Sequence, residues 1–181
     1  MNNNVLVPKW QYIGIPILGA AMLMVRLGSI EPLRLLWFEL LIVFGYIASV
    51  IDLRTKRIPN ELVLLMLAAW VITFVPGLFF EIDAAVRRLI SSILGFVSGG
   101  GIFLLVYLIS RNGLGGGDVK FIAAAGLYLG FGGIIPTILF GTILAATTGI
   151  ALIIMKKIGR KDAIPLAPFL YVGILITVFF Q

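Results

Sequence analysis

Long apolar stretches separated by short polar segments fill most of the chain. Seven such stretches can be marked, at residues 12–29, 34–51, 61–80, 89–110, 119–133, 135–155 and 164–180. At about 1.5 Å per residue, each can form a helix that crosses most or all of a bilayer core about 30 Å thick. The pattern therefore predicts an all-α fold, a polytopic transmembrane helical bundle of about seven spans.

The fifth and sixth stretches depend on one predicted turn. Residues 119–155 form a continuous apolar run that is interrupted only by "GFGGIIP", in which Gly130, Gly132, Gly133 and Pro136 favour a turn. With this turn the run makes two short crossings. Without it the bundle has six spans.

Composition agrees with a membrane protein. The 181 residues are 61% hydrophobic and only 12% charged, with a mean hydropathy of +1.14, whereas soluble domains carry about 25% charged residues. Little of the chain is left outside the spans, so we expect a single membrane-embedded domain over residues 1–181. The start, "MNNNVLVPKWQ", lacks the features of a cleavable signal peptide, and the first span is expected to remain in the mature protein.

The basic residues predict the orientation. With a cytoplasmic N-terminus, ten of the fourteen Lys and Arg residues lie on the cytoplasmic side and only Arg26, Arg34, Arg87 and Arg88 lie outside. Cytoplasmic loops carry the excess of Lys and Arg, so this orientation is favoured. The net charge of +6 is then mainly a topology signal with some attraction to anionic lipid. No basic face interleaved with aromatic residues indicates nucleic-acid binding.

The absence of cysteine and histidine excludes disulfides, thiol nucleophiles, Ser-His triads, and zinc or haem sites. We expect no metal and no cofactor, so the chemistry must use carboxylates, amines or hydroxyls. Of the eight acidic residues, six have simple structural explanations in loops, near a span end or at a helix start. These six are Glu31, Glu39, Glu61, Glu81, Asp83 and Asp162. Asp52 and Asp118 remain.

Asp52 ends the second apolar stretch and Asp118 begins the fifth. Two spans lie between them, and an even number of crossings returns the chain to the same side of the membrane. Two carboxylates that share a partly dry site tend to hold one proton between them. The ionised one can take a proton from water while the protonated one polarises a carbonyl, which is general acid–base hydrolysis of an amide.

The sequences around both aspartates suit such a role. Pro59 prevents helical continuation after Asp52, and Asn60 is a good N-cap for the third span. In "RNGLGGGDVKF" the glycines Gly113, Gly115, Gly116 and Gly117 allow positive φ and a close approach of backbone, so a peptide strand could lie against this loop.

A structural interpretation of this loop stays open. An aspartate after a glycine loop and before a helix is typical of an N-cap with a permissive turn. Lys120 can be an interfacial anchor or a charge partner for a carboxylate. The glycine patterns of nucleotide-binding loops do not fit "GLGGGDVK".

Taken together, three motifs resemble those of the type IV prepilin peptidases, membrane aspartyl proteases of the GxGD class. The G-x-G-D signature stands at residues 115–118 and is followed by Lys120, and "DLRTKRIPN" resembles the family's first aspartate motif. "IPLAPFLYVG" at residues 164–173 resembles its late Ile-Pro-x-x-Pro-Phe segment. The resemblance covers a core of residues 34–180.

This resemblance implies an aspartic-type endopeptidase in the inner (plasma) membrane, with its active site facing the cytoplasm. Its substrates would be type IV prepilins or pseudopilins, cut just before their apolar segment to release a basic leader peptide. Asp52 and Asp118 would be the catalytic pair, and Gly115, Gly116, Gly117, Lys120, Pro59 and Asn60 would position the substrate. Many family members also carry a cysteine-paired domain and methylate the new N-terminus. Because cysteine is absent and "LGSIEP" joins the first two spans, we expect no methyltransferase activity and no S-adenosylmethionine binding.

Two alternatives remain. One is the presenilin-like branch of intramembrane proteases, although the residue order in "PLAP" at 165–168 differs from their Pro-Ala-Leu element and no tyrosine precedes Asp52. The other is a small, non-enzymatic transporter in which the two aspartates relay protons or cations, a common role of acids within membranes.

Overall fold

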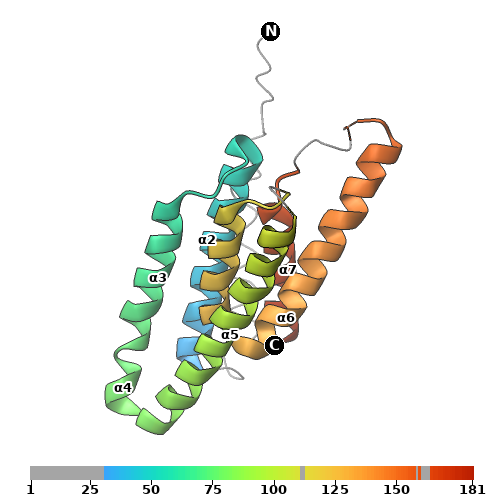
Figure 1. The fold of residues 1–181 in the computed structure, drawn as a ribbon. Coiled ribbons are helices and arrows are strands. Elements are labelled where there is room, and N and C mark those ends of the chain that lie inside the picture. Colours follow the sequence, from blue (N-terminus) through green and yellow to red (C-terminus); the bar gives the residue numbers. More distant parts are fainter. Residues whose placement is uncertain (1–30, 111–112, 158, 160–163) are drawn as a thin grey trace.

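The computed structural model describes residues 31–110, 113–157, 159 and 164–181. These residues form α2 (Pro32–Thr55), α3 (Asn60–Phe74), α4 (Gly77–Phe80), α5 (Ile82–Ile109), α6 (Gly116–Ile154) and α7 (Ala167–Phe180), and no strand occurs among them. The helices pack as a bundle (Figure 1), which confirms the all-α prediction. The predicted span at residues 12–29 lies outside the described residues, so the count of seven and the cytoplasmic N-terminus stay predictions.

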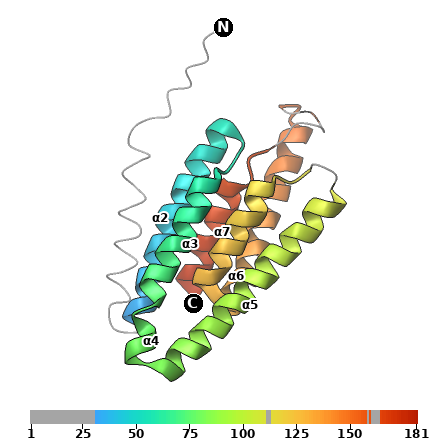
Figure 2. The same cartoon turned by 60° about the vertical axis from the view of Figure 1, so that its left-hand side comes forward.

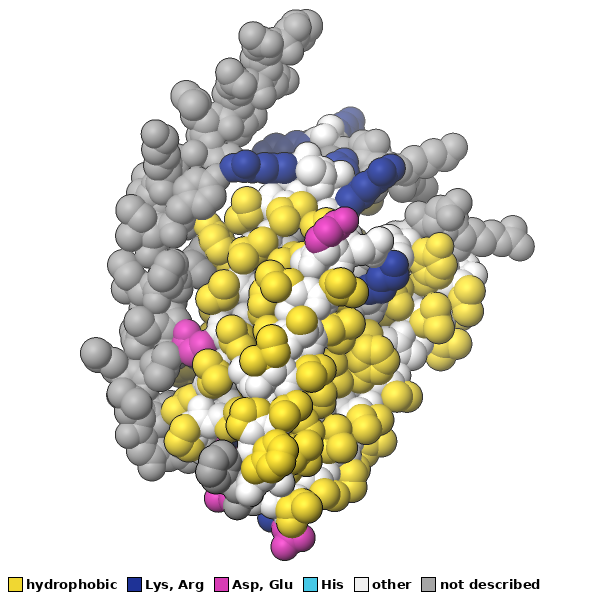
Figure 3. All heavy atoms as spheres, turned by 90° about the vertical axis from the view of Figure 1, so that its left-hand side faces the viewer, with side chains coloured by type: hydrophobic (Ala, Val, Ile, Leu, Met, Phe, Trp, Pro, Cys, Tyr) yellow, Lys and Arg dark blue, Asp and Glu magenta, His cyan; other side chains and the backbone are white. Residues whose placement is uncertain are grey.

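Four helical segments are long and apolar enough to cross a membrane: Pro32–Thr55, Asn60–Phe79, Ile82–Ile109 and Gly116–Ile154. The 14-residue α7 is also apolar but shorter. Figure 3 shows that hydrophobic side chains cover most of one flank of the bundle, with Lys and Arg gathered toward one end. Such a surface cannot face water over its whole area, and the protein is therefore a multi-pass membrane protein.

Helix α6 consists of two segments that run in opposite directions. They are joined at Gly130, whose φ of 66° and ψ of −177° are not helical. The first segment leads away from Asp118, and the second returns beside α7, with Gly133 against Gln181 and Gly149 against Ile164 (Figures 1 and 2). The predicted turn within "GFGGIIP" is confirmed at its first residue. Pro136, in contrast, lies inside the returning helix and not in the turn.

Side chains of two other helices bond to a carbonyl group just before this break. The last carbonyls of a helical segment have no amide to accept from within the helix. The carbonyl of Leu127 instead accepts hydrogen bonds from Trp70 Nε1, at 3.1 Å, and from Ser92 Oγ, at 2.7 Å. The chain reversal is therefore tied to both α3 and α5.

Glycines set the close contact between α5 and α6. Gly95 and Gly126 meet backbone to backbone, and a Cβ at Gly99 would lie 2.8 Å from Ile134. Small residues four apart allow this approach in membrane helices. The Gly95/Gly99 and Gly126/Gly130 pairs are therefore packing residues, which draw α5 against the first segment of α6.

Replacing Gly130 with alanine is expected to destabilise the bundle by about 1–3 kcal/mol, because its backbone conformation is essentially restricted to glycine. The added Cβ would also collide with Ser91 Oγ. Thermal unfolding in detergent should show the loss. Gly132→Ala is the matched control, since its Cβ would meet no atom closer than 3.8 Å. Equal melting temperatures for the two variants would contradict the strain at Gly130.

Candidate active site

Asp52 lies in the last turn of α2 and points into the protein. It is only 4% exposed, and its Oδ2 accepts a hydrogen bond of 3.0 Å from the backbone N–H of Ala167. Ala167 is the first residue of α7, so the carboxylate stands at the N-terminus of a helix, where the aligned peptide dipoles stabilise negative charge.

The preceding turns of α2 hold α7 in this register. Ser49 Oγ shares its hydrogen between the carbonyl of Gly45, at 2.7 Å, and that of Ala167, at 3.2 Å. At Gly45 the absent side chain leaves room for the ring of Tyr171, whose Cδ2 is 2.8 Å from where a Cβ would stand. The face of α2 that carries Asp52 is thus the face that α7 packs on.

Asp118 lies in the first turn of α6, at the same end of the bundle as Asp52. Gly117, the residue before Asp118, packs against Ile58 in the loop that follows the helix of Asp52, so both aspartates lie at one end of the bundle, as the parity of the crossings predicts. Asp118 Oδ1 is buried and has no hydrogen-bond partner among the described residues. This oxygen therefore keeps its capacity to accept or share a hydrogen bond.

The glycine loop provides space more than unusual backbone angles. Gly130 is the only glycine with positive φ in the described ranges, so the loop glycines do not use the positive φ that glycine allows. Backbone comes close at Gly117, as glycine allows, whereas the neighbour of Gly115 is a side chain. A Cβ at Gly115 would lie 2.8 Å from Asp118 Oδ2, and one at Gly117 would lie 2.9 Å from the Ile58 carbonyl oxygen, whereas nothing lies within 4 Å at Gly116.

The loop between α2 and α3 joins the two aspartate motifs. Helix α2 ends as Lys56 takes the left-handed conformation, with φ of 52°, and α3 starts after Pro59, so the predicted stop is confirmed. The predicted capping role of Asn60 was wrong, because no side-chain capping bond forms at this helix start. Asn60 Oδ1 instead accepts a hydrogen bond of 2.8 Å from Lys120 Nζ, which ties α3 to α6.

The contact of the α7 N-terminus with Asp52 was not predicted from the sequence. The motif at residues 164–173 indicated a family resemblance but no contact with either aspartate. The signal present in the sequence was Pro168, which is found at the first turn of this helix as proline commonly is. That feature predicts a helix N-terminus near residue 167 but not the carboxylate that it binds.

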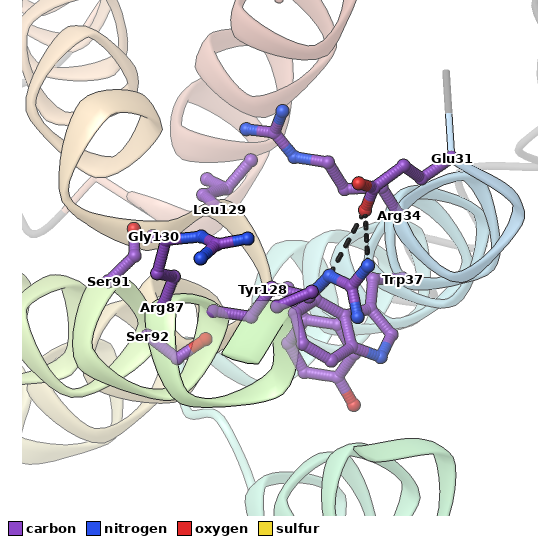
Figure 4. A pocket seen from close by; sticks show the side chains of 11 residues that line it. Glu31, Arg34, Trp37, Arg87, Ser91, Ser92, Tyr128, Leu129 and Gly130 are labelled. Atoms are coloured by element: carbon purple, nitrogen blue, oxygen red, sulfur yellow. Dashed lines mark hydrogen bonds and ion pairs between the residues drawn. The ribbon is translucent and has the colours of Figure 1, made fainter. Parts of the chain in front are cut away.

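A separate cavity of about 240 Å³ lies near the start of α2, at the other end of the bundle from Asp52. In Figure 4 Arg87 stands beside Gly130, and the dashed lines at Glu31 mark its hydrogen bonds with Arg88. The Arg88–Glu31 ion pair measures 2.7 Å, and Glu81 lies 3.4 Å from the same Arg88 nitrogen. Charged side chains line this cavity, neither aspartate is among its lining residues, and we do not assign it to the site.

The arrangement at the aspartate end can support acid–base chemistry. One carboxylate is held by a backbone amide at a helix N-terminus, and the other has a buried oxygen with no partner in the part of the chain that is described. Two acids in such different surroundings can divide the roles of base and acid between them. The chain contains no histidine or cysteine that could take either role.

Comparison with known proteins identifies the family. The model of the type IV leader peptidase family matches residues 39–150, a segment that contains both aspartates. The chain is similar to several proteins named prepilin leader peptidase/N-methyltransferase. The one from Xanthomonas campestris pv. campestris is 31% identical over 69% of the chain and 43% of its own length. The Aeromonas hydrophila protein is 27% identical over 81% of the chain and 48% of its own length. The Pseudomonas aeruginosa protein is 30% identical over 74% of the chain and 46% of its own length.

The chain thus spans less than half the length of these relatives. No solved structure matches it. With a family model that covers most of its residues, the chain belongs to the type IV leader peptidase family.

Proposed function

We propose that this protein is a membrane aspartic endopeptidase that removes the leader peptide from a type IV prepilin or pseudopilin. The observation that carries the proposal is the position of Asp52 and Asp118 on two helix ends that meet at one end of the bundle, within the segment that matches a leader peptidase family. The names of the relatives support the substrate class.

In the proposed reaction Asp52 is the base and Asp118 the acid. Asp52, whose negative charge the N–H of Ala167 stabilises, takes a proton from a water molecule, and the water oxygen bonds to the scissile carbonyl carbon. Asp118 donates a hydrogen bond from its protonated carboxyl group to the carbonyl oxygen. When the carbon–nitrogen bond breaks, the proton held by Asp52 passes to the leaving amine. Two positioned carboxyl groups suffice for these transfers.

We place the enzyme in the plasma membrane with the aspartates on the cytoplasmic side. Among the described residues, six basic side chains lie at the aspartate end: Arg54, Lys56, Arg57, Lys120, Lys156 and Lys157. Three lie at the opposite end: Arg34, Arg87 and Arg88. This bias follows the rule that cytoplasmic segments carry the excess of Lys and Arg.

Labelling of single cysteines tests the orientation, because the native chain has none. Thr55→Cys and Lys156→Cys, both exposed at the aspartate end, should react with a membrane-impermeant maleimide only from the cytoplasmic side. Asp83→Cys, exposed at the start of α5, should react only from the other side. Labelling of Thr55→Cys and Asp83→Cys from one side would contradict this topology.

For these 181 residues we propose the peptidase reaction alone, without methyl transfer or S-adenosylmethionine binding. The family whose model matches is described by leader peptidase activity, and the cysteine pairs expected with the second activity do not occur in the sequence.

The direct test of the proposed function mixes the purified protein in detergent with a prepilin and identifies the new N-terminus by mass spectrometry. Failure to cleave, combined with proton flux through the protein in liposomes, would favour the transporter instead.

A further inference from the structure

An apolar groove runs along the membrane face of the bundle beside the proposed active site. Its volume is about 560 Å³, and its walls are α3, α5 and the first segment of α6. Helix α5 packs along α6, whereas α3 and α5 make little contact with each other, so the groove opens between them. We call it the α3–α5 groove.

The polar side chains of the α3–α5 groove stand at one end only. These are Asn60 and Lys120, which are hydrogen-bonded to each other at 2.8 Å. Lys120 is two residues from Asp118, so the polar end is the aspartate end. The remaining wall is hydrocarbon and glycine, as at Val63 and Val97. A matching occupant is apolar along its length and becomes polar where it reaches Asp118.

Small residues in the wall point to a helix as the occupant. Gly100 and Gly101 lie side by side on α5, and a Cβ at Gly101 would meet nothing within 4 Å. Glycine and alanine let a second helix backbone approach closely in a membrane, whereas a lipid chain adapts to a wall of any shape. From Val97 to Leu104 the groove follows α5 over about 10 Å, which is roughly two turns of a helix.

We propose that the α3–α5 groove binds an apolar helical segment of the substrate and thereby directs the adjoining peptide bond toward Asp118. This inference rests on the proposed peptidase function and adds where the substrate is held. The first two turns of the apolar segment would lie against Gly101, and the peptide chain would pass Asn60 and Lys120 on its way to the carboxylates.

Filling the groove tests the proposal. Gly101→Leu places a side chain in open space, so the fold should remain, while kcat/KM for a full-length prepilin should fall by about tenfold or more, mainly through a higher KM. The matched control is Gly132→Leu, the same change at an exposed position outside the groove. Equal KM values for Gly101→Leu and the wild type, as expected if only lipid occupies the groove, would overturn the proposal.

Cross-linking gives a second, independent measurement. Val97→Cys in the groove, combined with Asp52→Asn to prevent turnover, should form a disulfide with a cysteine placed early in the apolar segment of a prepilin. Ile153→Cys, exposed on the returning segment of α6, should not. No cross-link at Val97 would contradict the docking site even if Gly101→Leu unfolds. If the wild type cleaves no prepilin, the proposed function itself fails, whereas normal cleavage with neither effect rejects the groove alone.

Discussion

Replacement of either aspartate by asparagine is expected to lower kcat for prepilin cleavage by about 10²–10⁴-fold, the usual contribution of a general acid or base. Asparagine has nearly the same shape as aspartate, so packing should persist, but it can neither take a proton from water nor share one. In Asp52→Asn the amide oxygen can still accept from Ala167 N–H, which bonds Oδ2 in the native protein. In Asp118→Asn no existing bond to Oδ1 is lost, since that atom has no described partner.

The measurement is the initial rate of cleavage in detergent, beside the melting temperature of each variant. Glu61→Gln is the matched control, because Glu61 is an exposed acid at the start of α3 near the same end of the bundle. Its rate should equal that of the wild type. If Asp52→Asn or Asp118→Asn cleaves at the normal rate, the assignment of the catalytic pair is wrong.

The three glycines before Asp118 should respond differently to alanine, although all three belong to the same motif. Gly117→Ala is expected to be the most harmful, because its Cβ would lie 2.9 Å from the carbonyl oxygen and 3.2 Å from the nitrogen of Ile58. Backbone atoms cannot rotate away, so the loop before α3 must move from the start of α6. Overpacking of this kind typically costs about 1–3 kcal/mol, and both stability and cleavage should fall.

Gly115→Ala should affect activity more than stability. Its Cβ would lie 2.8 Å from Asp118 Oδ2, which is the end of a side chain that can rotate, so the fold tolerates the change while the carboxyl group is displaced. Gly116→Ala should be close to neutral, since its Cβ meets nothing, and alanine favours the helix by up to about 1 kcal/mol. Cleavage rates and melting temperatures of the three variants test this order. Equal activity in all three would show that the glycines do not position Asp118.

Local patterns in the sequence predicted much of the architecture. Hydropathy and length predicted the helices because a membrane span needs a continuous apolar stretch wherever it lies in the fold. The reversal at Gly130 followed from turn-forming residues within an apolar run. The common end of Asp52 and Asp118 followed from counting crossings, which needs no knowledge of packing.

The details of the site depended on contacts between distant residues. Asp52 meets Ala167 across 115 positions, and Lys120 meets Asn60 across 60. Asn60 was expected to cap its own helix, as its residue type favours, but its oxygen accepts from Lys120 instead. Local preference could not predict this outcome, since the competing donor comes from another helix.

The sequence alone determined that this is a helical membrane protein with two carboxylates at one end of the bundle, because hydropathy and parity are properties of the chain order. Only the tertiary structure determines which atoms lie against the loop glycines and which backbone amide binds Asp52. Gly115 and Gly117 have ordinary backbone angles and are small because Asp118 and Ile58 occupy the adjacent space. Which atoms fill that space is set by helix packing, and packing joins residues that no local pattern connects.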